Sequence, residues 1–170
     1  VRWEASLASP RGINDVERLV ELVGRVSRVG DSVCVRAFQG SVGCVNVARD
    51  RANVVWSQQA SGTEGAHGDS EAIYGTESNG HVIAWRRDDG TRLWSSDRLR
   101  LRKLTAPLVL GRSVVLGDES GWVHFLSRVD GAPLNRVMTD SSGMVVAPVV
   151  AADTLVVVTR SGGVYGFRPD

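Results

Sequence analysis

The chain has 170 residues, of which 42% are hydrophobic and 23% charged, and its formal net charge is +1. This composition is that of a globular chain long enough for one domain with a core, and the near-zero charge argues against a nucleic-acid-binding protein, which needs a concentrated basic surface. The sequence shows no apolar run of about 18 residues, no signal peptide and no lipidation motif, and it begins at Val1 without a methionine, so we expect a processed or excised piece whose cellular address is not written in it.

The first predicted element is a short strand over residues 1–6, which contains Trp3. It resembles the tryptophan strands found further along the chain around Trp56 and Trp94, but no repeat unit precedes it. We therefore expect it to be the orphan outer strand of a blade.

Residues 7–24 do not repeat and are predicted to form an insertion between blades. Asn14 or Asp15 can N-cap a short helix there, with Glu17 and Arg18 exposed and the apolar residues packed inward. Two interpretations remain open. The segment is an ordinary surface loop packed on a blade edge, or it is a protein-binding insertion, since loops on rigid scaffolds often carry recognition.

A repeat of 40 or 41 residues fills the rest of the chain. Its clearest landmark is a glycine two residues before a valine, found at Gly40, Gly80, Gly121 and Gly162. A polar turn lies about ten residues earlier in each unit, and short β-branched stretches of strand length lie between the landmarks. The units are predicted at residues 25–59, 60–97, 98–139 and 140–170, and the last of them stops where its tryptophan strand should begin.

Four strands in about 40 residues form the unit of a β-propeller blade. The predicted fold class is therefore all-β, a β-propeller of four-stranded antiparallel blades with about four blades present. Because a blade cannot bury both faces alone, such units stack in arrays. The strand at 1–6 either completes the last blade, within one chain or between two, or belongs to a missing blade of a larger propeller, which we favour. Open blade faces also predict self-association.

Cys34 and Cys44 lie on consecutive strands around the turn at Gly40. A two-residue turn places them on opposite faces of the sheet, whereas a looser turn brings them face to face. We favour two buried free thiols, with a cross-strand disulfide as the alternative.

Two other patterns predict packing and exposure. Trp56 and Trp94 recur at one place in their units, so we expect each ring to wedge against the neighbouring blade. Residues 98–103 alternate arginine with leucine and end in lysine, which predicts a strand with one charged face. That face is either a solvated blade edge or a basic edge for an acidic partner or for β-augmentation.

No catalytic, cofactor-binding or metal-binding residue is predicted. His67, His81 and His124 are scattered through different units without ligand spacing, and no further cysteine completes a metal site with Cys34 and Cys44.

The repeat resembles the PQQ-type propeller repeat, best in the stretch from Gly80 to Trp94. The ordered set of motifs resembles a narrower group, the BamB family of outer-membrane assembly lipoproteins. The segments that carry this resemblance are residues 17–21, 104–109, 115–121, 140–143 and 163–166. Their order and spacing match the C-terminal half of such proteins, whose full propeller has eight blades.

The resemblance implies a function, a location and a partner. Members of this family are non-enzymatic scaffolds of the β-barrel assembly (BAM) complex on the periplasmic side of the outer membrane, lipid-anchored in the full-length protein. They bind the periplasmic domains of BamA, in part through acidic residues in the insertion. The partner-binding residues implied here are Glu17, Arg18, Leu19, Glu21 and Val23.

The chain departs from the family pattern within this insertion. Glu21 stands where one acidic residue is expected, but Val23 stands where a second aspartate is common. Residues 24–26 replace a more usual segment of small and polar residues ending in proline.

Two other functions compete with the scaffold. One is a propeller adaptor with another periplasmic partner. The other is a fragment of a PQQ-dependent dehydrogenase, which would need acidic and amide ligands for Ca²⁺ and commonly has a disulfide between adjacent cysteines. No two cysteines are adjacent here, so we favour the scaffold.

Overall fold

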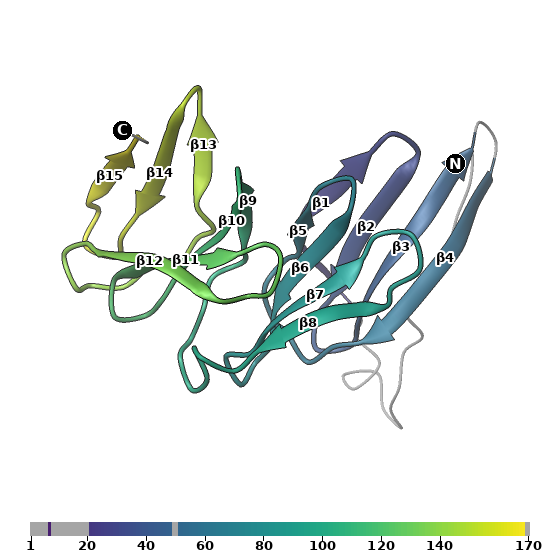
Figure 1. The fold of residues 1–170 in the computed structure, drawn as a ribbon, viewed down its shortest axis with the longest axis horizontal. Helices are drawn as coiled ribbons and strands as arrows, with labels where there is room; N and C mark the ends of the chain where they lie inside the picture. The colour runs from purple at the N-terminus through teal and green to yellow at the C-terminus, as the bar shows by residue number, and fades with distance from the viewer. Residues whose placement is uncertain (1–6, 8–20, 49–50, 169–170) are drawn as a thin grey trace.

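The computed structural model of the chain describes residue 7, residues 21–48 and residues 51–168. Within these residues the named elements are all β-strands, which form four antiparallel sheets that follow one another along an open arc (Figure 1). Each sheet is a propeller blade, with its strands ordered as in the sequence. The predicted all-β propeller is therefore confirmed. In the described part of the chain, no helix has the length and apolar character needed to cross a membrane.

The strands are short and joined mostly by tight turns. Blade 1 contains β1 (Leu22–Val29), β2 (Ser32–Ala37), β3 (Ser41–Ala48) and β4 (Arg51–Gln59). Blade 2 contains β5 (His67–Gly68), β6 (Ala72–Thr76), β7 (Val82–Arg86) and β8 (Arg92–Ser96). Blade 3 contains β9 (Leu108–Leu110), β10 (Ser113–Gly117), β11 (Trp122–Ser127) and β12 (Pro133–Met138).

Blade 4 contains three strands within the described residues: β13 (Val149–Ala151), β14 (Thr154–Val158) and β15 (Val164–Phe167). The predicted strand at residues 1–6 and the predicted short helix after Asn14 lie outside the described residues. The first strands of blades 1 to 3 lie side by side along the inside of the arc, since β5 contacts both β1 and β9.

Three apolar clusters hold successive blades together. Because side chains alternate along a strand, each blade offers one face to the blade before it and the other to the blade after it. Blades 1 and 2 share a cluster that includes Cys34, Val42, Trp56, Ile73 and Trp85. Blades 2 and 3 share one that includes Tyr74, Val82, Trp94, Val114 and Leu126. Blades 3 and 4 share one that includes Val115, Val123, Met144, Leu155 and Val157.

The recurring tryptophans pack against the next blade, as predicted. The Trp56 indole N–H donates to the backbone oxygen of Arg87 at 2.6 Å, and Trp94 donates in the same way to Arg128 at 2.8 Å. A Cβ built on Gly90 would lie 2.5 Å from the Trp56 ring, so the glycine of the next blade's turn makes room for the ring.

The prediction of a strand at residues 98–103 was wrong. Residues 98–101 form a turn after β8, in which Leu99 is buried and Leu101 is 86% exposed. Leu101 has a φ of 65°, a left-handed conformation that interrupts any extended run. The two leucines therefore do not share a sheet face, and the basic residues project from a turn.

Candidate partner-binding surface

The segment predicted to carry the partner site is described only in part. Glu17, Arg18 and Leu19 lie outside the described residues. Glu21 is exposed immediately before β1, and Val23 lies within β1, partly buried and paired with Arg36 of β2. The structure thus places Glu21 and Val23 at the same end of blade 1.

β1 begins at Leu22, three residues earlier than the predicted start of the first blade. Gly24 has a φ of 74°, and a Cβ built on it would lie 2.5 Å from the Cα of Gly65. Only a residue without a side chain fits this close backbone approach. The register of β1 against β2 also shifts between Val23 and Ser27, which accommodates the irregular start of the strand.

Glu21 sits beside the turn between β2 and β3. Its backbone oxygen accepts a hydrogen bond from the Phe38 N–H at 2.7 Å, and the Gln39 N–H donates to the backbone oxygen of Gly62 at 3.0 Å. The Phe38 side chain is 44% exposed. An acidic and an aromatic residue are therefore held next to each other at an exposed rim, a combination suited to contact with another protein.

A buried ion pair between Arg36 and Glu77 stabilises the rim around Glu21 and Phe38. The Arg36 guanidinium is fully buried and donates to the Glu77 carboxylate at 3.1 Å and to the Thr76 backbone oxygen at 3.2 Å. Glu77 also accepts hydrogen bonds from the Ser61 N–H and hydroxyl. Burial lowers the pKa of Arg36, and the charge of Glu77 opposes that change. Because an unpaired buried charge is strongly disfavoured, the pair fixes blade 1 against blade 2.

Cys34 and Cys44 form a disulfide, so the favoured prediction of free thiols was wrong. The two residues are directly paired across β2 and β3, with their Cα atoms 4.0 Å apart. The connecting turn has three residues, with Gln39 at a φ of 46°, and this is the looser turn that brings the cysteines face to face. Closing a loop of this size stabilises a fold by about 3 kcal/mol.

A second buried arginine lies against the disulfide. Arg87 follows β7 and donates to the Ser27 hydroxyl at 2.5 Å, to the Ser32 hydroxyl at 3.1 Å and to the Cys34 sulfur at 3.2 Å. These acceptors belong to blade 1, so Arg87 ties blade 2 to it. Burial lowers the pKa of Arg87, and Asp69 opposes the change.

Blade 3 contains a comparable centre around Asp118. The fully buried Asp118 carboxylate accepts hydrogen bonds from Arg102 at 2.6 Å and from the Trp122 and Ser120 amides at 3.0 and 2.9 Å, and it lies 2.8 Å from the His124 ring nitrogen. Burial raises the pKa of Asp118, but the hydrogen bonds outweigh burial and lower it to about 2. Asp118 is therefore a buried structural carboxylate of blade 3.

Among the residues that the structure describes, no group of three or more histidine, cysteine, aspartate or glutamate side chains is placed to hold a metal ion. His67 accepts a hydrogen bond from the Val109 N–H, and His124 pairs with Asp118, so both rings have contacts within the fold.

Comparison with known proteins identifies the family. A family model described as outer membrane protein assembly factor BamB matches residues 1–96. The outer membrane protein assembly factor BamB of Burkholderia pseudomallei is 41% identical over 167 residues, which are 98% of this chain and 43% of that protein. The chain belongs to the BamB family. It spans somewhat under half the length of the curated BamB proteins that it matches.

Solved structures show the fold that goes with BamB. BamB from Moraxella catarrhalis superposes with a TM-score of 0.83 at 22% identity, covering 93% of this chain and 46% of that one. The quinohemoprotein alcohol dehydrogenase from Comamonas testosteroni superposes with a TM-score of 0.67 at 17% identity, covering 89% and 29%. The propeller is thus shared between BamB and these dehydrogenases, and the family membership rests on sequence.

Three buried charged residues could not be recognised from the sequence. Arg36, Arg87 and Asp118 are charged residues in or beside strands, and such positions usually indicate exposure. The repeat itself could have indicated a structural role for Arg87. Arg87 and Arg128 each directly follow the third strand of their blade, so an arginine recurs at one position of the repeat.

Proposed function

We propose that this chain is a non-enzymatic scaffold of the outer-membrane β-barrel assembly complex, acting on the periplasmic side of the outer membrane. Membership of the BamB family supports this role. The full-length protein would be lipid-anchored, as the family resemblance implies.

We further propose that the scaffold binds the periplasmic domains of BamA through its edge loops. The contact residues are Glu17, Arg18, Leu19, Glu21 and Val23. The observation that carries this proposal is the exposed Glu21 beside the exposed Phe38, on a rim fixed by the Arg36–Glu77 pair. A rigid rim with an acidic and an apolar element limits the entropy lost on binding.

Binding of the chain to isolated BamA periplasmic domains tests this proposal. We expect Glu21→Arg to weaken binding at least tenfold through charge reversal, and Leu19→Ala to weaken it through lost apolar contact. Glu71→Arg is the matched control, because Glu71 is exposed on the β5–β6 turn at the other end of its blade. Equal affinity of Glu21→Arg, Leu19→Ala and the control would show that the contact lies elsewhere. It would then favour an adaptor that binds another periplasmic partner.

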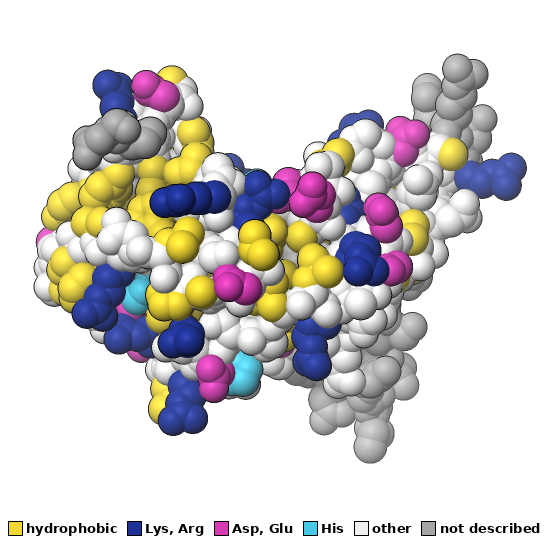
Figure 2. Space-filling model, in the orientation of Figure 1, with side chains coloured by type: hydrophobic (Ala, Val, Ile, Leu, Met, Phe, Trp, Pro, Cys, Tyr) yellow, Lys and Arg dark blue, Asp and Glu magenta, His cyan; other side chains and the backbone are white. Residues whose placement is uncertain are grey.

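Self-association through the open blade faces belongs to the same proposal. The valine of the repeat landmark is fully buried at Val42, Val82 and Val123, where a following blade covers it, but Val164 is 69% exposed. Hydrophobic side chains gather at the C-terminal end of the arc, over β14 and β15 (Figure 2). The same apolar face of a second copy of the chain is complementary to it, and packing of the two faces would bury both.

A further inference from the structure

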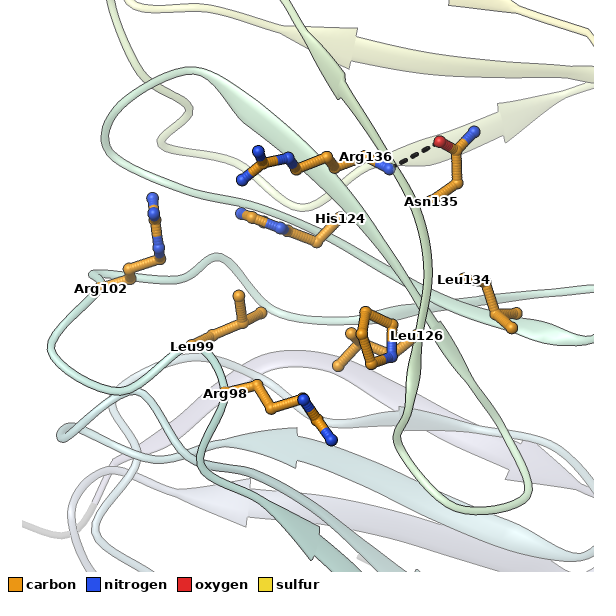
Figure 3. Close-up of a pocket in the computed structure, with 9 residues that line it drawn as sticks. Arg98, Leu99, Arg102, His124, Leu126, Leu134, Asn135 and Arg136 are labelled. Atoms are coloured by element: carbon orange, nitrogen blue, oxygen red, sulfur yellow. Dashed lines mark hydrogen bonds between the residues drawn. The ribbon is translucent and has the colours of Figure 1, made fainter.

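A groove lies between the turn at residues 98–102 and the outer strands of blade 3 (Figure 3). Its volume is about 490 Å³, and its lining includes Arg98, Leu99, Arg102, His124, Leu126 and Arg136. It is separate from the rim around Glu21, since it is built on blade 3 and the connection that leads into it. A volume of this size accommodates several side chains of a peptide.

The groove has an excess of positive charge. Arg98, Arg102 and Arg136 contribute three guanidinium groups, and the carboxylate that neutralises Arg102 is Asp118. Asp118 is fully buried and already bonded to Arg102, His124 and two backbone amides. Arg98 also interacts electrostatically with the carboxylate of Asp130, which is exposed on the β11–β12 turn. Among the described residues, neither Arg98 nor Arg136 is in a salt bridge, so both guanidinium groups are accessible to an incoming anion.

The positive groups are separated by apolar side chains. Figure 3 shows Arg136, His124 and Arg102 toward one end of the groove, Leu99 and Leu126 in the middle, and Arg98 toward the other end. Leu126 is 1% exposed and lies under the groove, whereas Leu134 of β12, which also lines the groove, is 44% exposed. A complementary ligand therefore carries negative charge at both ends and an apolar group between them.

The geometry of blade 3 favours an extended ligand. β12 is the edge strand of its sheet, and most of its residues are exposed, including Arg136. The Arg136 guanidinium lies 4.5 Å from the centre of the Trp122 ring, and this cation–π contact restrains the side chain at one end of the groove. In an extended peptide, side chains at positions i, i+2 and i+4 share one face, which matches the order charge, apolar, charge.

We propose that this groove binds an extended acidic segment of a partner protein, with carboxylates on Arg98 and Arg136 and an apolar side chain against Leu99 and the exposed Leu134. This second contact rests on the proposed scaffold function and adds a recognition rule to it, an acidic–apolar–acidic pattern at alternate residues. Bidentate pairing of arginine with carboxylate supplies the specificity.

The test is calorimetric titration of the whole chain with the capped heptapeptide Thr-Glu-Thr-Val-Thr-Glu-Thr. We expect Arg98→Gln and Arg136→Gln each to weaken binding roughly tenfold, and the double variant to lose it. Arg160→Gln is the matched control, since Arg160 is an exposed arginine on the β14–β15 turn, away from the groove. Circular dichroism of each variant checks that the exposed substitutions leave the fold intact.

Three results would overturn the proposal. One is a double variant that binds like Arg160→Gln, and another is a peptide with glutamine in place of glutamate that binds as well as the acidic one. The third is displacement of the peptide by inorganic phosphate at equal concentration, which would indicate a site for simple anions. Glu21→Arg should bind the peptide like the unmodified chain, so that loss of BamA binding and loss of peptide binding are separate outcomes.

Discussion

At the scale of single residues, the fold depends on charged side chains that are buried with their partners. Arg36, Arg87 and Asp118 each have several hydrogen bonds inside the protein. A buried group of this kind contributes little net stability when its network is complete, but removal of one partner leaves a buried charge without compensation. Substitutions that keep the shape of these side chains but remove their charge should therefore lower the free energy of unfolding.

Asp118→Asn is the sharpest test of this dependence. The pKa of Asp118 is lowered from its usual 3.8 to about 2, which corresponds to about 2 kcal/mol of stability at neutral pH. Because the folded pKa lies below the unfolded one, this contribution is complete above about pH 4 and is lost as the pH falls toward 2. We expect urea unfolding to show a deficit of about 2 kcal/mol for the variant at pH 7, which narrows between pH 4 and pH 2.5. Asp97→Asn, in an exposed position, should show no comparable deficit, and a deficit for Asp118→Asn that is unchanged at pH 2.5 would contradict the assignment.

The disulfide illustrates what the sequence could not determine at this scale. Cys34 and Cys44 are face to face in a three-residue turn and on opposite faces in a two-residue turn. The turn sequence fits either length, and Gln39 in a left-handed conformation is not the residue that usually signals such a turn. A difference of one residue in the length of the turn therefore decides whether the two cysteines remain thiols or form a disulfide.

At the scale of elements, blades 1 and 2, and blades 2 and 3, are each joined by a contact between a tryptophan of one blade and a glycine in a turn of the next blade. Trp56 lies against Gly90, and Trp94 lies against Gly131. The two tryptophans and the glycine–valine repeat were recognisable in the sequence, and their spacing was sufficient to predict blades and their stacking. The turn at residues 98–102 was not predictable, because alternation of arginine and leucine is typical of a strand while the conformation of Leu101 is set by the connection between blades.

Replacement of Gly90 by alanine tests the tryptophan contact. Gly90 and Gly111 both have positive φ, 71° and 54°, but a Cβ at Gly111 would meet no atom within 4 Å. Gly111→Ala should therefore cost only the backbone strain, about 1 kcal/mol. Gly90→Ala should cost an additional 1–3 kcal/mol, roughly, because the new methyl group collides with the Trp56 ring. Chemical denaturation of both variants measures the two losses in the free energy of unfolding. Equal losses would show that the Trp56 ring moves aside without a measurable cost in stability.

At the scale of the whole molecule, the described residues form an arc of four blades, and the outer face of the fourth blade is exposed. The repeat places Val164 in register with Val42, Val82 and Val123, all of which are fully buried by the next blade. The curated relatives are more than twice as long as the region aligned with this chain. The sequence predicted the open face from the repeat count, but it could not predict the exposure of its individual residues.

Val164→Asp separates packing within the arc from association between arcs. We expect the unmodified chain to form dimers or larger assemblies at micromolar concentration in light-scattering measurements, because an exposed aliphatic face on β14 and β15 is stabilised by burial. Val164→Asp should shift the chain to the monomer with little change in stability, since the side chain is already 69% exposed. Val123→Asp should instead unfold the protein, because it places a charge in a fully buried cluster. Val129→Asp controls for added charge, as Val129 is exposed on the β11–β12 turn and not on the open blade face. A monomeric unmodified chain, or an assembly that survives Val164→Asp, would show that this blade face does not associate with a second copy.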